Sequence, residues 1–144
     1  MPISLNLMFI ATGHKDLDPD QPPGAALLRS LSAGLARSGW STDELDNWRD
    51  SGWSIKCRRS SSELEVVLGQ VENGEWLLQV NPYRVPGVIG TLLGRKPSAT
   101  PSEVHALAVG VQRALSSSGS LENPRWCWDG FPDEKHSTAE PQMA

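Results

Sequence analysis

Residues 53–80 read WSIKCRRSSSELEVVLGQVENGEWLLQV, and this stretch decides the fold. Apolar side chains occupy every second position in three runs, which is the period of a strand with one buried face. The three runs are Trp53 to Arg58, Glu63 to Leu68 and Trp76 to Val80. A serine-rich turn separates the first two runs, and Asn73-Gly74, whose residues both tolerate a positive φ, separates the last two. The stretch therefore predicts an antiparallel meander of three strands.

A helix is predicted on each side of the meander. Residues 25–38 carry an apolar stripe at helical spacing, and Gly39 is well placed to end that helix. Gly34 inside the helix either lowers its propensity or permits close packing. Thr100-Pro101-Ser102-Glu103 is a capping box with proline at the first helical position, so a second helix begins there, and Gly119 ends it.

Two further strands complete the predicted fold. Residues 3–11 alternate between apolar and polar side chains, and residues 125–128 form a short strand. Trp126 and Trp128 share one face of that strand, which is either core or an exposed aromatic patch, and we favour core. The order β-α-β-β-β-α-β predicts an α+β two-layer sandwich, with a mainly antiparallel five-stranded sheet and two helices on one face. We expect a single domain over residues 1–132 and a disordered polar tail over residues 133–144.

Composition excludes some classes of function. The chain has 144 residues and a net charge of −4. The resulting pI of about 5.3 argues against a nucleic-acid binder and gives no attraction to an anionic membrane. No apolar run approaches the roughly 18 residues that a membrane span needs, and the N-terminus lacks the features of a signal peptide. We therefore expect a cytoplasmic protein.

The acidic loop before the first helix has the beginning of a calcium motif. Asp16, Asp18 and Asp20 have the required spacing. Gln21 and Leu27 then stand where such a loop needs glycine and a bidentate glutamate. We therefore interpret the segment as a solvated loop.

Cofactor motifs are incomplete. Gly94-Arg95-Lys96-Pro97 is the nearest run to a phosphate loop, but it lacks the Walker spacing, and Pro97 blocks a following helix. His14, His105 and His136 do not have the spacing of metal ligands. We expect no cofactor and no metal.

The two cysteines leave alternatives open. Cys57 and Cys127 are too few for a disulfide framework, so buried reduced thiols are the default, and a cross-sheet disulfide is the second interpretation. A small enzyme that uses one of these thiols as a nucleophile is a further alternative. Cysteines within apolar strands are usually inert, which disfavours it.

Tryptophan is over-represented, with 6 Trp against 2 Phe and 1 Tyr. Trp53 has the apolar parity of its strand, so we assign it to the core. Trp48 precedes that strand in a loop with acidic residues, which makes it a candidate anchor for a partner. We expect the contact surface on two loops, Asp43 to Asp50 and Tyr83 to Lys96. The candidate residues are Trp48, Arg49, Asp50, Tyr83, Arg84 and Arg95.

Five segments together carry a resemblance to a known group. They are Asn47-Trp48-Arg49-Asp50-Ser51-Gly52-Trp53, Glu75-Trp76-Leu77-Leu78-Gln79-Val80, Pro86-Gly87, Leu93-Gly94-Arg95-Lys96-Pro97-Ser98-Ala99 and Arg125-Trp126-Cys127-Trp128-Asp129-Gly130. Over residues 3–134 the chain resembles small uncharacterised bacterial proteins that are similar to the immunity proteins of polymorphic toxin systems. The resemblance implies a non-enzymatic cytoplasmic protein that binds a toxin and blocks it by occlusion, and it brings no catalytic residues.

Two other resemblances lead to different functions. The α-β-β-β-α core order resembles a double-stranded-RNA-binding domain, but Thr100-Pro101-Ser102-Glu103 stands where that family has a basic cluster, so we expect no RNA binding. The size, acidity and element order also resemble secretion chaperones, which are homodimers that wrap effector segments. Those chaperones usually end in a further helix, whereas this chain ends in a polar stretch.

Overall fold

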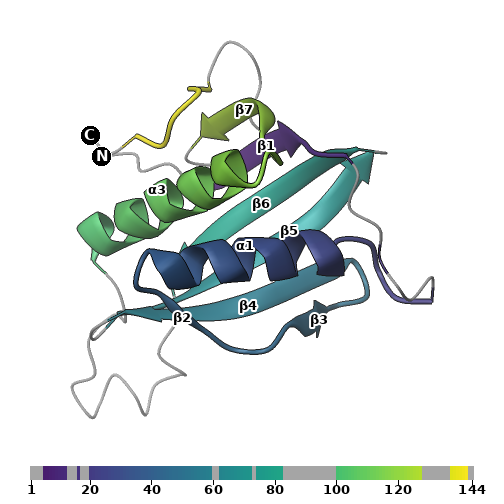
Figure 1. Cartoon of the computed structure of the whole chain (residues 1–144), viewed down its shortest axis with the longest axis horizontal. Helices are drawn as coiled ribbons and strands as arrows, with labels where there is room; N and C mark the ends of the chain where they lie inside the picture. Colours follow the sequence, from purple (N-terminus) through teal and green to yellow (C-terminus); the bar gives the residue numbers. More distant parts are fainter. Residues whose placement is uncertain are drawn as a thin grey trace.

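A computed structural model gives the fold of the chain, and it describes residues 5–12, 16, 20–59, 62–72, 74–82, 100–127 and 137–142. The elements are β1 (Asn6–Ile10), α1 (Ala25–Arg37), β2 (Ser41–Thr42), β3 (Asp46–Trp48), β4 (Gly52–Arg59), β5 (Ser62–Glu72), β6 (Glu75–Pro82), α3 (Pro101–Ser117) and β7 (Glu122–Cys127). Helices α1 and α3 lie next to each other on one face of the sheet (Figure 1). The predicted two-layer α+β sandwich is confirmed.

The sheet has more strands than the alternation of side chains indicates. Its order is β2-β4-β5-β6-β1-β7, with β3 also beside β4, and every pairing among the described strands is antiparallel. The prediction of five strands is therefore too low, since seven are present in the described part of the chain. The two additional strands, β2 and β3, have 2 and 3 residues, which is too short for a period of two to be recognised. Both pair with the outer edge of β4.

The core lies between the helices and the sheet. The apolar side chains of the meander point into it, and Ile55, Leu68 and Leu78 are at most 1% exposed. Trp53 is half-buried and packs against this core, in agreement with its strand parity. Trp126 is 1% exposed and belongs to the core, as predicted, whereas Trp128 lies outside the described residues.

Both helices begin with side-chain caps. Thr100 caps α3 as predicted, because its hydroxyl accepts a hydrogen bond from the Glu103 backbone N–H at 3.3 Å. In α1 the cap comes from a residue well before the helix in the sequence. The Asp16 carboxylate accepts hydrogen bonds from the backbone N–H groups of Gly24 at 3.0 Å and Ala26 at 2.8 Å. The solvated-loop interpretation is therefore wrong for Asp16. Within the described part of the chain, neither helix has the length and apolar character needed to cross a membrane.

The two helices approach closely at Gly34. A Cβ atom placed on Gly34 would lie 2.5 Å from the Cβ of Ala114 on α3, which is closer than real Cβ atoms approach. The second interpretation of Gly34 is therefore correct, because this glycine permits close packing at the cost of some helix propensity.

Part of the C-terminal stretch is ordered, contrary to prediction. Thr138 and Trp126 exchange two backbone hydrogen bonds of 2.8 and 2.9 Å, so the chain after β7 returns along the outer edge of that strand. Gln112 on α3 fixes this return, since its side chain donates to the Ala139 carbonyl at 3.0 Å and accepts from the Trp126 indole N–H. The prediction of a disordered tail is therefore wrong for residues 137–142. The polar sequence of this segment gives no sign that a side chain on α3 holds it.

Candidate functional site

The face of the sheet opposite the helices carries an apolar area. Along β4 and the first half of β5 this face is polar, as the alternation predicts, with Lys56 and Glu65 as members. Further along it becomes apolar, and Val67 is only 5% exposed although no described helix covers this face. Val71 is 43% exposed, and among the described residues it is the one large apolar side chain that is well exposed. An uncovered apolar area within a sheet face is a candidate contact surface.

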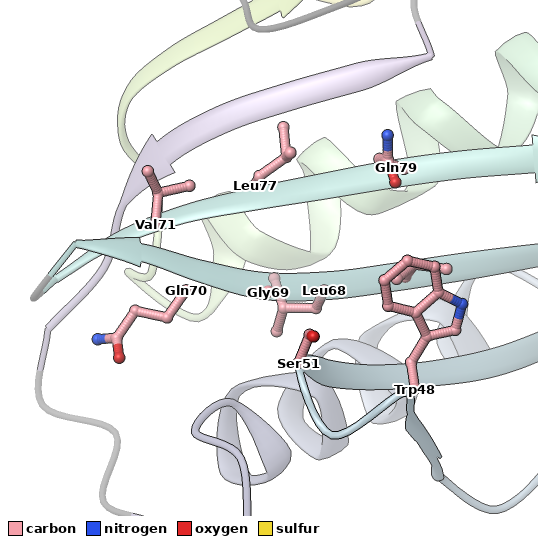
Figure 2. Close-up of a pocket in the computed structure, with 9 residues that line it drawn as sticks. Trp48, Ser51, Leu68, Gly69, Gln70, Val71, Leu77 and Gln79 are labelled. Atoms are coloured by element: carbon pink, nitrogen blue, oxygen red, sulfur yellow. The ribbon is translucent and has the colours of Figure 1, made fainter.

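A depression of about 260 Å³ lies in this apolar area. The residues that line it are Trp48, Ser51, Val67, Leu68, Gly69, Gln70, Val71, Leu77 and Gln79. In Figure 2 the helices lie behind the sheet, and the indole of Trp48 lies over β5 on the near side. None of these nine residues, all in the described part of the chain, carries a charge. The depression therefore suits an uncharged, apolar group.

Cross-strand register explains the depression. Trp48 pairs with Gly52, Gly52 with Gly69, and Gly69 with Leu77, so these residues form one row across β3, β4, β5 and β6. The two members in the middle of the row have no side chain. A gap thus opens on the sheet surface, with Trp48 on one side and Leu77 on the other.

The turn after Trp48 is tight and strained. Arg49 and Asp50 have φ values of 53° and 56°, and the Ser51 N–H donates to the Trp48 carbonyl at 3.0 Å, which is the pattern of a type I′ turn. Asn47 holds this turn, because its side-chain oxygen accepts from the Asp50 N–H at 2.8 Å and its amide donates to the Asp50 carboxylate at 3.1 Å. Non-glycine residues at positive φ cost about 1 kcal/mol or more, and they persist where the surroundings fix them.

Trp48 is held beside the depression by this turn. The sequence predicts Trp48 in a loop, but the structure shows it as the last residue of β3, half-buried. The Arg49 guanidinium lies 4.9 Å from the centroid of its ring, which is a cation–π distance. The indole therefore presents an apolar surface in a restricted orientation, with a positive charge next to it.

The structure brings together half of the predicted site. Trp48, Arg49 and Asp50 share the β3–β4 turn, and Trp48 also lines the depression. The other three candidates, Tyr83, Arg84 and Arg95, lie outside the described residues.

Residues on β5 and β6 were not predicted for the site. Val67 and Leu77 are the main ones, and both sit at positions of polar parity in their strands. In the sequence, the signal for this second apolar area is an apolar residue at a position where the alternation predicts a polar one.

Cys57 is unsuited to nucleophilic catalysis. Its side chain is fully buried in the helix-facing core, and burial, with a smaller contribution from the charge of Asp43, raises the pKa of the thiol to about 12. The thiol is therefore protonated at neutral pH, and the nucleophilic form is absent.

The two cysteines cannot form a disulfide with each other. Cys57 is on β4 and Cys127 is on β7, and β5, β6 and β1 lie between these strands. Strands lie about 4.8 Å apart, so four steps put the two residues roughly 19 Å apart. Cys127 is also half-buried, so the prediction of two fully buried thiols holds for Cys57 and is wrong for Cys127.

An ion-pair cluster lies at the polar end of the open face. Arg58 contacts Asp43 at 2.6 Å and Glu63 at 3.2 Å, and all three side chains are well exposed. The hydrogen bond from Arg58 lowers the pKa of Asp43 below its usual value, with desolvation opposing it. Among the described residues, no group of three or more His, Cys, Asp or Glu side chains is arranged to hold a metal ion.

A second hollow of about 440 Å³ lies between α3 and the C-terminal segment. His105, Gln112 and Arg113 line it from the helix, and Glu140 and Pro141 line it from the other side. Gln112 is engaged in bonds that hold the fold, and the hollow has both polar and apolar walls. We therefore regard the depression beside Trp48 as the stronger candidate site.

Comparisons of the chain with protein-family models, with curated proteins and with solved structures gave no match. The site must therefore be interpreted from its own geometry.

Proposed function

We propose that this chain is a bacterial protein-binding domain, immunity-like, which blocks a toxin partner by occlusion. Its contact surface in this proposal is the Trp48 turn, with Arg49 and Asp50, together with the adjoining depression on the open sheet face. The observation that carries the proposal is Trp48, which is half-buried on a sheet face that no described helix covers, beside an apolar depression without charged walls.

Tryptophan in this setting is typical of an interface anchor. Residues that carry most of the binding energy in protein interfaces are enriched in Trp, Tyr and Arg, and they lie in well-packed apolar surroundings. Trp48 lines the depression, and Arg49 stacks on its ring within the turn. The strained turn holds them in place before a partner arrives, which reduces the entropy lost on binding.

The sheet edges are poorly suited to binding a partner, which favours the face. On the side of β7, Thr138 pairs with Trp126, and Pro124 has no N–H to donate. On the side of β4, the described edge consists of the very short strands β2 and β3. Short strands, proline and covering segments are the usual ways in which proteins prevent strand addition.

The proposal includes a cytoplasmic location and a non-enzymatic role. Cys57 and Cys127 are too far apart to form a disulfide with each other, which is compatible with the reducing cytoplasm. The high pKa of Cys57 argues against the enzyme alternative for that residue.

The test is reconstitution with a purified partner. The immobilised chain is used to capture proteins from its source cells, and a stoichiometric partner is then purified and titrated against the chain by calorimetry. Trp48→Ala should weaken binding by about 30-fold or more, since an interface anchor contributes about 2 kcal/mol or more. The control is Arg113→Ala, an exposed residue on the helix layer, which should change the affinity less than twofold.

Other outcomes would overturn the proposal. Loss of binding in Arg113→Ala with full binding in Trp48→Ala would place the interface on the helix layer. Repeated recovery of no stoichiometric partner, together with a homodimer in light scattering, would favour the secretion-chaperone alternative. A melting temperature for Trp48→Ala close to that of the wild type is required, so that lost affinity is not lost folding.

A further inference from the structure

Gly69 is a glycine that the fold does not need. It lies within β5, a strand with neighbours on both sides, where glycine weakens the strand. Its φ is not in the left-handed region. A Cβ atom at this position would meet only the Ser51 carbonyl oxygen, at an ordinary contact distance of 3.5 Å. Gly52 differs, because a Cβ there would lie 2.2 Å from the Leu68 carbonyl oxygen.

The missing side chain leaves the floor of the depression open. Gly69 lies in the row between Gly52 and Leu77, and it lines the depression directly. Any larger residue at this position would project from the open face of β5 into the space between Trp48 and Leu77. The free volume of about 260 Å³ therefore depends on glycine at position 69.

We infer that Gly69 keeps this depression open to receive one uncharged, apolar side chain of the protein partner; the inference rests on the proposed function and names what the partner must present. The walls are Val67, Val71 and Leu77, and a charged side chain seated on them would lose water without a counter-charge. Gln79 also lines the depression and provides an amide group for the backbone that carries the apolar side chain.

Size and shape favour a protein side chain over other occupants. Sites for drug-sized ligands and cofactors usually occupy about 300–1,000 Å³, and this depression is smaller. A second copy of the chain, facing the same surface in a two-fold pair, would offer only Val71 as an exposed large apolar side chain of the described residues. Val71 lines the depression and is not a protruding anchor.

The test uses capped amino acids as defined probes. Isotope-labelled protein is titrated with N-acetyl-leucinamide and N-acetyl-phenylalaninamide, and separately with the aspartate and lysine analogues, while backbone amide resonances are followed. The apolar probes should give saturable shifts at Gly69, Val71 and Leu77, and the charged probes should give none. Gly69→Val should abolish the shifts at the remaining positions. The control is Glu65→Val, which places the same side chain on the same face of β5 outside the depression and should leave them unchanged.

Three results would overturn the inference: equal shifts with charged probes, shifts that persist in Gly69→Val, or shifts that appear on concentrating the protein without any probe, which would identify a second copy as the occupant. The purified partner separates this inference from the proposed function. Gly69→Val should weaken partner binding at least tenfold. If Trp48→Ala weakens binding and Gly69→Val does not, the proposed contact surface stands and the inference fails. If neither variant weakens binding, the proposed contact surface and the inference both fail.

Discussion

The contact between Gly34 and Ala114 allows a quantitative test of the helix layer. Replacing Gly34 by alanine should raise the intrinsic stability of α1 by about 1 kcal/mol, because glycine is the poorer helix former. The new methyl group would lie 2.5 Å from the Cβ of Ala114 and 3.2 Å from its Cα, so the helices must separate. Overpacking of this kind typically costs about 1–3 kcal/mol, in addition to cancelling the propensity gain.

We therefore expect Gly34→Ala to lower the free energy of unfolding by about 1–3 kcal/mol. For a domain of this size, that corresponds to a fall in melting temperature of roughly 3–10 °C. Ala114→Gly alone should cost about 1 kcal/mol from lost helix propensity. In the double variant the shortest overlap disappears, so Gly34→Ala should cost at least 1 kcal/mol less in the Ala114→Gly background than in the wild type.

Urea unfolding of all four proteins, with a common slope against denaturant, measures this coupling. Effects that add within about 0.5 kcal/mol would refute the close contact, because independent sites behave in that way. A stabilised Gly34→Ala single variant would refute it as well, since only the propensity gain would then remain.

Three further predictions concern single residues. Asp16→Ala should lower the free energy of unfolding by about 1 kcal/mol in urea melts, because two N–H groups of α1 lose their acceptor; an unchanged value would show that water replaces the cap. Cys57 should resist iodoacetamide at pH 8 in the folded protein. The pKa of this thiol is about 12 in the folded protein and 9.0 in the unfolded chain, so the protonated thiol stabilises the fold below pH 9 and this stability is lost as the pH rises toward 12. At pH 10.5 the wild type should have lost about 2 kcal/mol, whereas Cys57→Ala should show no such loss. Gly69→Val should raise stability by up to about 1 kcal/mol in thermal melts while closing the depression, and a large loss would show that the fold requires this glycine after all.

Patterns within single segments of the sequence were sufficient to predict the three central strands and the start of one helix. The alternation in residues 53–80 predicts β4, β5 and β6 with their core faces, and the capping box at Thr100 predicts the start of α3. Asp16 caps a helix that begins nine residues later, a distance at which no capping motif is recognisable in sequence. The ordered segment around Thr138 was missed because a helix side chain, Gln112, holds it.

Half of the candidate site could be predicted from the sequence, because that half lies within a single segment. Trp48 is conspicuous by residue type and by its acidic neighbours. The depression beside it is not visible, because it arises from the pairing register of Gly52, Gly69 and Leu77 on three strands. Register depends on the whole sheet, so no single segment contains this information.

The position of β1 has a consequence for how the protein folds. This strand is synthesised before the other described strands, yet it lies between β6 and β7, which come much later in the chain (Figure 1). Phe9 pairs with Trp76, and Met8 pairs with Arg125, so the second partner is synthesised long after the first. Contacts between such distant residues slow folding, because a long loop must close before they form. Until β7 is available, β1 has one open edge, and an exposed apolar strand edge promotes aggregation.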